Sequence, residues 1–279
     1  MKKLLLSVFT AGLGFLSFSQ TVVMGVSPSS IAVSFDYTLG ETSFGANNFT
    51  TEAVIAEAIF AEDGTTGTDV NGHPLSHRGC TAFTNAAAMN GKIALISRGE
   101  CDFGLKALNA QNAGARAVVV INNATGMINM QGGNSGPQVT IPAVSISLAD
   151  GNILREALAQ GPITLLIGQK LGAFANDVSV AKAEVLTPRY MTHNFLLSSS
   201  PNAPVGMVVR NSGSSTATGV TAKISLVNEA NVAVYEEELG PYDINTGDSV
   251  KLLPGSTDVF PTLSAATPVG DYTLKFEAI

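Results

Sequence analysis

The chain has 279 residues, a formal net charge of −7, and charged side chains at only 13% of its positions. An acidic and sparsely charged protein is a poor partner for nucleic acid or for anionic membranes, which select lysine and arginine. A chain of this length usually folds as two domains.

The first segment predicts a signal peptide over residues 1–19. Two lysines precede an apolar run at 4–18, and Ser17 and Ser19 are the small residues that a signal peptidase requires, so we expect cleavage before Gln20. Cleavage would change the net charge from −7 to −9. The apolar run is too short to span a bilayer comfortably, and no later segment is long and apolar enough. We therefore expect a secreted or cell-surface protein without a membrane span.

The next part of the chain predicts short strands joined by loops. Residues 21–36 hold two apolar runs split by Ser27-Pro28, which predict two short strands. Residues 37–51 are polar and contain glycine, which predicts a loop. Residues 53–61 favour a strand, with a helix as the alternative, and residues 62–85 favour a loop.

A strand, a helix and a second strand are expected between residues 92 and 121. Residues 92–97 predict a buried strand, and the carboxylate of Asp102 is placed to cap the helix that follows. Apolar positions at 103, 107, 110 and 114 share one helix face, and Gly114 suits a left-handed cap. The β-branched run at 117–121 predicts a strand buried on both faces.

A second helix should begin at a capping box formed by Ser147 and Asp150. Gly161-Pro162 should end this helix, and residues 163–168 should return as a strand.

The pattern changes completely after a short hinge. We place a first domain with its N-terminal strands at 20–170, the hinge at 171–177 and a β-sandwich at 178–279. Short alternating runs separated by turn residues predict this all-β module. The runs lie at 178–186, 203–211, 219–227, 231–239, 248–253 and 270–279.

Four blocks in the first domain carry a family resemblance. They are GKIALISRGECDF at 91–103, AQNAGA at 110–115, AVVVINN at 117–123 and IPAV at 141–144. In this order and spacing they resemble the protease-associated (PA) domain over residues 53–169. The resemblance implies an α+β fold, with a β-sandwich or barrel core and short flanking helices. It also implies a module that binds or positions protein substrates and is not itself catalytic.

The second module carries a less specific resemblance. Residues 205–238 resemble the CARDB and fibronectin-type modules of bacterial exported proteins, which are immunoglobulin-like sandwiches. The combination suggests an exported protein of a Bacteroidetes-like bacterium. Because such sandwiches usually need about seven strands and six runs are present, we expect an incomplete sandwich and a parent gene that continues beyond residue 279.

The two cysteines, Cys80 and Cys101, are expected to form a disulfide. Export makes the pairing chemically allowed, and the resemblance supports it because many PA domains pair cysteines at these places. Closing a loop of this length would stabilise the fold by ~3 kcal/mol on the chain-entropy model. A metal-binding or nucleophilic role is less favoured, because the chain has no Cys-x-x-Cys pair and no histidine in a catalytic context.

No catalytic, metal-binding or cofactor-binding set of residues is expected. His73 and His77 have the i, i+4 spacing of a zinc helix, but Pro74 lies between them and the general-base glutamate is missing. Solvated loop residues are the favoured interpretation, with adventitious metal binding as the alternative. The stretch 63–69 is more consistent with a turn than with a calcium loop, since it lacks alternating oxygen ligands and a terminal glutamate.

One segment is a candidate recognition loop, at residues 126–137. Its apolar side chains would be exposed and accompanied by polar neighbours; the candidate residues are Met127, Ile128, Met130, Gln131 and Asn134. A plain connection between two strands is the alternative interpretation.

The leading functional hypothesis is a noncatalytic binding module with a polypeptide partner, or alternatively a glycan partner. Two further hypotheses stay open: the accessory region of a secreted peptidase whose catalytic domain lies outside this chain, and a cell-surface adhesion scaffold.

Overall fold

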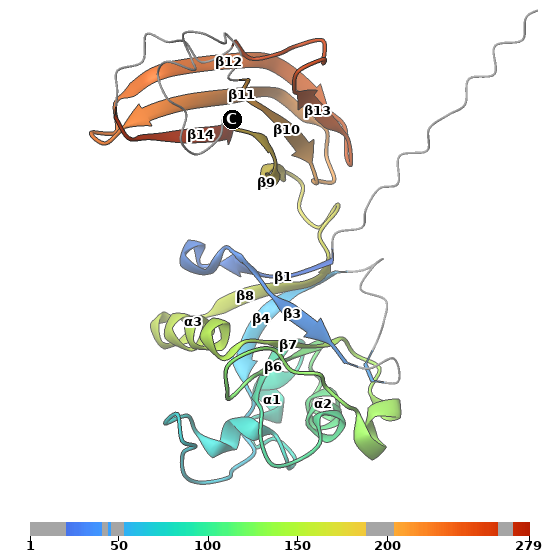
Figure 1. The fold of residues 1–279 in the computed structure, drawn as a ribbon. Coiled ribbons are helices and arrows are strands. Elements are labelled where there is room, and N and C mark those ends of the chain that lie inside the picture. The colour runs from blue at the N-terminus through green and yellow to red at the C-terminus, as the bar shows by residue number, and fades with distance from the viewer. Residues whose placement is uncertain (1–20, 41–43, 46–52, 188–203, 262–269) are drawn as a thin grey trace, which may run out of the picture.

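The computed structural model describes residues 21–40, 44–45, 53–187, 204–261 and 270–279. The predicted signal peptide and His193 lie outside these residues. A first module of mixed strands and helices is joined through residues 170–177 to a second module of strands (Figure 1). None of the helices in the described parts combines the length and apolar character needed to cross a membrane.

The first module contains eight strands, three α-helices and short 3-10 helices within the described residues. The strands are β1 (Thr21–Ser27), β2 (Ser34–Phe35), β3 (Tyr37–Leu39), β4 (Ala53–Phe60), β5 (Ile93–Ser97), β6 (Ala117–Ile121), β7 (Ala143–Ile146) and β8 (Ile163–Gln169). The helices are η1 (Ser29–Ile31), η3 (Leu75–Arg78), α1 (Ala86–Met89), α2 (Phe103–Asn112), η4 (Gly133–Gln138) and α3 (Leu148–Gln160).

The eight strands form one sheet that curls almost closed. The strand order is β2-β1-β8-β4-β5-β6-β7-β3, and β4 to β7 are parallel. Strands β2 and β3 stand at opposite ends of this order, yet only Asp36 separates them in the chain. One residue cannot cross the width of an open sheet, so the two edges must come together. The expected barrel-like core is therefore present.

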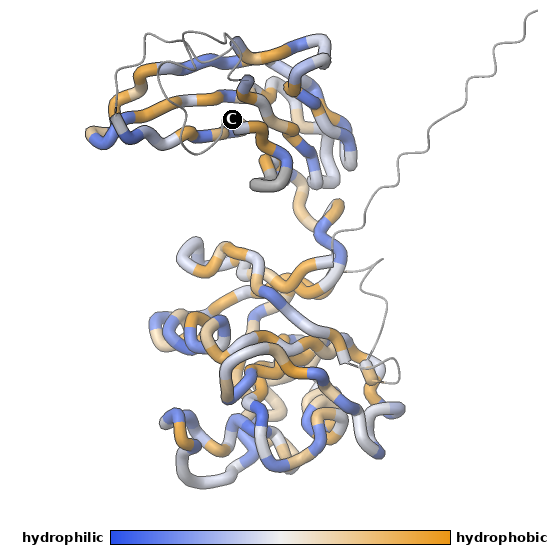
Figure 2. The backbone as a smooth tube through the Cα atoms, viewed as in Figure 1, coloured by the Kyte–Doolittle hydropathy of each residue, from blue (hydrophilic) through white to orange (hydrophobic). Residues whose placement is uncertain are grey.

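Both faces of the central strands are buried, which explains their uninterrupted apolar sequence. Alternate residues of β5 and β6 enter two separate clusters. Ile93 and Leu95 pack with Leu154 of α3 on one face, while Ala94 and Ile96 pack with α2 on the other. The apolar stretches in Figure 2 follow these strands. Two helices on opposite faces thus exclude water from the same sheet.

The helix boundaries agree with the sequence, with one correction. Ser147 accepts a hydrogen bond from the backbone N–H of Asp150 at 3.1 Å, which confirms Ser147 as the N-cap of α3. Gly114 has φ +82°, as a left-handed cap requires. Asp102 is the N-cap residue of α2, but its side chain makes no capping hydrogen bond, because the carboxylate lies against Gly133 instead.

A second correction concerns residues 37–51, which were expected to be a loop throughout. Residues 37–39 form β3 and pair antiparallel with β7, Tyr37 opposite Ile146. This strand lies at one end of the strand order, and its pairing depends on the closure of the sheet, which the local sequence does not report. The strand expected at 53–61 is confirmed as β4.

All six runs of the second module are strands, and they form two three-stranded sheets within the described residues. The strands are β9 (Val178–Leu186), β10 (Gly206–Asn211), β11 (Ala217–Asn228), β12 (Ala233–Ile244), β13 (Ser249–Leu252) and β14 (Tyr272–Ala278). The sheet orders are β13-β10-β9 and β12-β11-β14, and apolar side chains from both sheets share one core.

The segment expected to be a hinge is hydrogen-bonded to the second module. The N–H of Gly172 donates to the carbonyl of Ser212 at 2.7 Å, and the N–H of Ser214 donates to the carbonyl of Phe174 at 2.7 Å. The ammonium of Lys170 pairs with the carboxylate of Asp177 at 3.0 Å. The start of the linker, next to β8, is therefore the place where we expect the two modules to separate.

Limited digestion with chymotrypsin should cut after Leu171 or Phe174 and release fragments of about 150 and about 100 residues, each within the usual size of a domain. Asp177→Ala removes the ion pair with Lys170 and should speed this cut relative to the unaltered chain. Mass spectrometry of the fragments locates the cleavage. Cuts scattered through the strands of both modules would argue for one merged domain.

Candidate functional site

The loops that follow the parallel strands gather at one edge of the first module. Strands β4, β5, β6 and β7 run in the same direction, so the segments after residues 60, 97, 121 and 146 leave from the same edge (Figure 1). We call this the carboxyl edge. Ligand sites of sheets with parallel strands usually lie there, because residues distant in sequence meet at that place.

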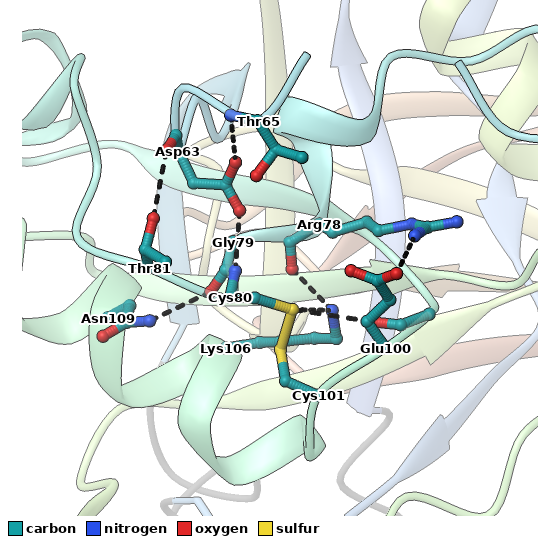
Figure 3. The surroundings of a disulfide bond; sticks show 11 residues. Asp63, Thr65, Arg78, Gly79, Cys80, Thr81, Glu100, Cys101, Lys106 and Asn109 are labelled. Atoms are coloured by element: carbon teal, nitrogen blue, oxygen red, sulfur yellow. Dashed lines mark hydrogen bonds and ion pairs between the residues drawn. A yellow bond between two sulfur atoms is a disulfide. The ribbon is translucent and has the colours of Figure 1, made fainter. Parts of the chain in front are cut away.

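A disulfide anchors the long loop 61–85 to the start of α2. Cys80 and Cys101 are bonded, with their Cα atoms 5.7 Å apart (Figure 3). The pairing implied by the resemblance is therefore present in the structure. The bond joins the loop after β4 to the turn after β5, two of the segments that meet at the carboxyl edge.

The carboxylate of Asp63 organises the same loop from inside. One oxygen accepts from the N–H of Thr65 at 2.9 Å, and the other accepts from the N–H of Cys80 at 2.8 Å. Thr81 donates its hydroxyl to the Asp63 carbonyl at 3.0 Å. Burial would raise the pKa of Asp63, but the hydrogen bonds from Thr65 and Cys80 outweigh it and lower the pKa. Within the segment 63–69, which was predicted to be a plain turn, Asp63 is therefore a buried anion that holds the loop together by hydrogen bonds.

Lys106 of α2 is a buried cation beside the disulfide. Its side chain is 0% exposed, and Nζ donates to the Arg78 carbonyl at 2.6 Å and lies 3.5 Å from the Cys80 sulfur (Figure 3). Burial, assisted by the positive charge of Arg78, lowers the pKa of Lys106 to about 8. The side chain therefore ties α2 to the loop through a carbonyl and a sulfur.

A second cation, the half-buried Arg155 of α3, joins the same loop to the sheet. Its guanidinium donates to the Ser97 hydroxyl at 2.7 Å and to Nδ1 of His77 at 3.2 Å, and lies 4.4 Å from the centre of the Phe60 ring. The rings of Phe60 and His77 stack at 4.3 Å. Because arginine can only donate, Nδ1 of His77 accepts, and its Nε2–H donates to Glu62 at 3.0 Å.

The prediction that both histidines of the loop are solvated is wrong. The side chain of His77 is 12% exposed and that of His73 is 18% exposed, with His73 3.8 Å from the Asp69 carboxylate. They are half-buried because α3 and Phe60 cover the loop, a contact that the loop composition does not indicate. Within the described residues, no three or more His, Cys, Asp and Glu side chains gather in a way that could hold a metal ion.

A rigid turn at residues 69–73 presents an apolar side chain to solvent. The Asp69 carboxylate accepts from the N–H groups of Asn71 and His73 at 2.8 and 2.9 Å. The side-chain amide of Asn71 donates to the carbonyl of Asn123 at 3.0 Å, which joins this turn to the segment after β6. At the tip, Val70 is 98% exposed.

The candidate recognition loop is only partly exposed. Met127 is 41% exposed, and Gln131 and Asn134 are also exposed. The expectation that Ile128 and Met130 are exposed is wrong: they are 4% and 1% exposed and pack in the cluster under α2. The backbone of this loop packs closely against the backbone of α2 at Gly104, and this packing buries the two side chains in the core.

Several of these residues were not singled out from the sequence. Lys106 could have been noticed, because it falls on the apolar face of α2 beside Phe103, Ala107 and Ala110. The position of a charged residue on that face is a recognisable signal. Arg155 and Val70 gave no such signal, because their roles depend on which distant segments cover them or leave them uncovered.

Comparison with known proteins defines the class of the first module. Residues 61–154 match the PA domain family, so the chain contains a PA domain. The match covers the long loop, the disulfide, α2 and the start of α3.

Individual relatives each match a part of the chain. The aminopeptidase YwaD of Bacillus subtilis is 41% identical over 107 residues, which cover 38% of this chain and 22% of that protein. The ER degradation-enhancing alpha-mannosidase-like protein 3 of Xenopus laevis is 39% identical over 92 residues, covering 30% of this chain and 10% of the relative. The solved aminopeptidase from Aneurinibacillus sp. strain AM-1 is 27% identical, with a TM-score of 0.39, over 54% of this chain and 30% of that one. This chain thus spans well under half of each relative.

The stacked His77 predicts a pH-dependent stability. Burial lowers the pKa of His77 from its ordinary 6.5, and Arg155 lowers it further, against the opposing charge of Glu62. The unfolded chain then binds this proton more tightly than the folded chain. The free energy of unfolding should be highest above pH 6.5 and fall as the pH decreases through that value.

Urea unfolding between about pH 5 and pH 8 measures the effect. Asp and Glu also contribute to the slope, so the informative quantity is the difference between the unaltered protein and His77→Gln. Identical slopes in the two proteins would contradict a titrating His77.

The packing of the loop on α2 predicts that Gly104 cannot be enlarged. A Cβ at this position would lie 1.9 Å from the Gly132 carbonyl oxygen and 2.5 Å from the Gly136 nitrogen. Gly→Ala within a helix normally stabilises by about 0.5–1 kcal/mol, but here the clash should make Gly104→Ala destabilising by ~1–3 kcal/mol. Chemical denaturation checks this against the exposed Asn112→Ala on the same helix, which should change stability by less than about 0.5 kcal/mol. Stabilisation by Gly104→Ala would show that the loop is not held against α2.

Proposed function

We propose that this chain is an accessory recognition unit of an exported peptidase, in which the PA domain contacts polypeptide and carries out no chemistry. The observation that carries the proposal is the distribution of the shared part. A part of about 100 residues is similar in an aminopeptidase and in an alpha-mannosidase-like protein. A part common to proteins with different reactions is better suited to recognition than to one catalytic step.

The geometry of the carboxyl edge supports a recognition role. Val70 and Met127 project from two segments that the Asn71–Asn123 hydrogen bond joins, and Gln131 and Asn134 add exposed amides. We call these four exposed residues the recognition surface. A turn fixed by internal hydrogen bonds loses little conformational entropy on binding, which favours a preorganised contact. Its mixed apolar and amide character suits an extended polypeptide better than a charged ligand.

The second module supports the alternative of an adhesion scaffold. Two three-stranded sheets around one core are consistent with an immunoglobulin-like or CARDB-type spacer, which would hold the PA domain at a distance from a surface or from another domain. Binding through the PA domain favours the accessory role. Binding that survives substitution of the recognition surface would favour adhesion through the second module or a glycan partner.

The test uses the full chain and reduced, carboxymethylated casein as the polypeptide probe. Fluorescence anisotropy should show binding that weakens about tenfold in the double variant Val70→Ser, Met127→Ser, which corresponds to about 1.4 kcal/mol. The matched control is Val234→Ser on β12, where the side chain is 39% exposed and lies in the other module. The probe should also remain uncleaved on prolonged incubation. Casein hydrolysis by the purified chain, or equal affinity in the double variant, would overturn the proposal.

A further inference from the structure

The charge of Lys106 is poorly compensated in the disulfide-bonded protein. Among the ion pairs of the described residues, Arg78 has Glu100 at 3.1 Å, whereas Lys106 pairs with no carboxylate. Asp63 and Glu100 act on it only from a greater distance. Its near neighbours are a carbonyl and a neutral disulfide sulfur. A buried ammonium is costly in such surroundings, because a neutral sulfur is a weak acceptor.

Reduction would supply the missing anion. A thiolate on Cys80 would carry a full negative charge beside the ammonium, where the sulfur and Nζ are 3.5 Å apart. We propose that Cys80 is a reactive thiolate site for thiol–disulfide exchange, stabilised by Lys106, and that mixed disulfides with low-molecular-weight thiols form on Cys101. Stabilising the reduced form makes a disulfide easier to reduce.

The exchange balances as follows. The thiolate of a thiol reductant attacks the sulfur of Cys101, a new S–S bond forms there, and the Cys80–Cys101 bond breaks. The electron pair leaves on the sulfur of Cys80, beside the Lys106 ammonium. A second thiolate then attacks the reductant's sulfur in the mixed disulfide and releases Cys101 as a thiolate. The protein disulfide is reduced by two electrons, and the reductant is oxidised to its own disulfide.

The other charges around the two sulfurs act in both directions. Cys101 is flanked in the chain by Glu100 and Asp102, whose carboxylates disfavour a thiolate between them. The start of α2 favours an anion at Cys101, but the helix end carries only about half a charge. Asp63 opposes an anion at Cys80, since its carboxylate accepts from the Cys80 N–H at 2.8 Å. The carboxylate of Asp63 is, however, occupied by backbone donors, whereas the ammonium lies against the sulfur itself.

The loop has other anchors that hold it in place when the disulfide opens. Lys106 also donates to the Arg78 carbonyl, and the side-chain amide of Asn109 donates to the Gly79 carbonyl at 3.0 Å (Figure 3). Both cysteines are partly exposed, so a small thiol can reach them. The exchange therefore does not require the loop to unfold.

The first test uses the unaltered full chain. Without reductant it should contain no free thiol on titration under denaturing conditions. Brief exposure to reduced glutathione, acid quenching, alkylation and peptide mass spectrometry should then find the glutathione adduct on Cys101 and the alkylated thiol on Cys80. An adduct mainly on Cys80 would overturn the proposal.

The second test measures the two thiols separately, as Cys101→Ser and Cys80→Ser variants. The rate of iodoacetamide alkylation against pH should give Cys80 a thiol pKa well below the about 8.5 of free cysteine, and Cys101 a higher value. Adding Lys106→Met to Cys101→Ser should lower the alkylation rate near pH 7 by about tenfold, while Lys106→Arg, which keeps the charge, should retain most of it. Equal pKa values for the two thiols, or no effect of Lys106→Met, would overturn the proposal.

Discussion

The burial of the parallel strands on both faces is the constraint on which the rest of the first module depends. Strands β5 and β6 send alternate side chains into two separate apolar clusters, so each face must be covered. Helix α2 covers one face and α3 covers the other. The parallel strands all end at the carboxyl edge and begin at the opposite edge, so every connection leaves from the carboxyl edge and the segments after the strands gather there.

Two cations, the buried Lys106 and the half-buried Arg155, hold those segments in place. Lys106 on α2 and Arg155 on α3 each reach across to the long loop after β4, one at the Arg78 carbonyl and the other at His77. Each cation is fixed mainly by neutral acceptors, an aromatic ring or a sulfur, and not by a close carboxylate. Such contacts orient the two cations but do not neutralise their charge as an ion pair would. The stability of the loop should therefore depend on the protonation of His77 and on whether the neighbouring sulfur is oxidised or reduced.

The same arrangement holds the surface around the exposed turn in one conformation. Asp63, the disulfide and the two cations hold the long loop against the sheet and helices. The Asp69 carboxylate holds the turn at 69–73 through hydrogen bonds within the turn. Val70 at the tip of that turn and Met127 in the neighbouring segment remain exposed. A rigid scaffold with a small uncovered surface is a common way to present a binding determinant, because the ordering is complete before the partner arrives.

The sequence alone determined the elements whose signals are local. The apolar runs at 92–97 and 117–121 predicted β5 and β6, Ser147 and Asp150 predicted the start of α3, and the alternation after residue 178 predicted the six strands of the second module. The four blocks between residues 91 and 144 indicated the PA domain and, through it, the pairing of the two cysteines. These predictions are confirmed because periodicity, helix caps and turn residues depend on a few neighbouring side chains.

Only the tertiary structure decided which side chains are covered in the loops. Ile128 and Met130 are buried, His77 is stacked, and β3 pairs with β7, all because of contacts with segments far away in the chain. Local composition gives the same polar, glycine-rich pattern whether a loop is solvated or packed against a helix. The closure of the sheet and the approach of α2 and α3 determine the difference, because burial is a property of the assembled chain and not of any one segment.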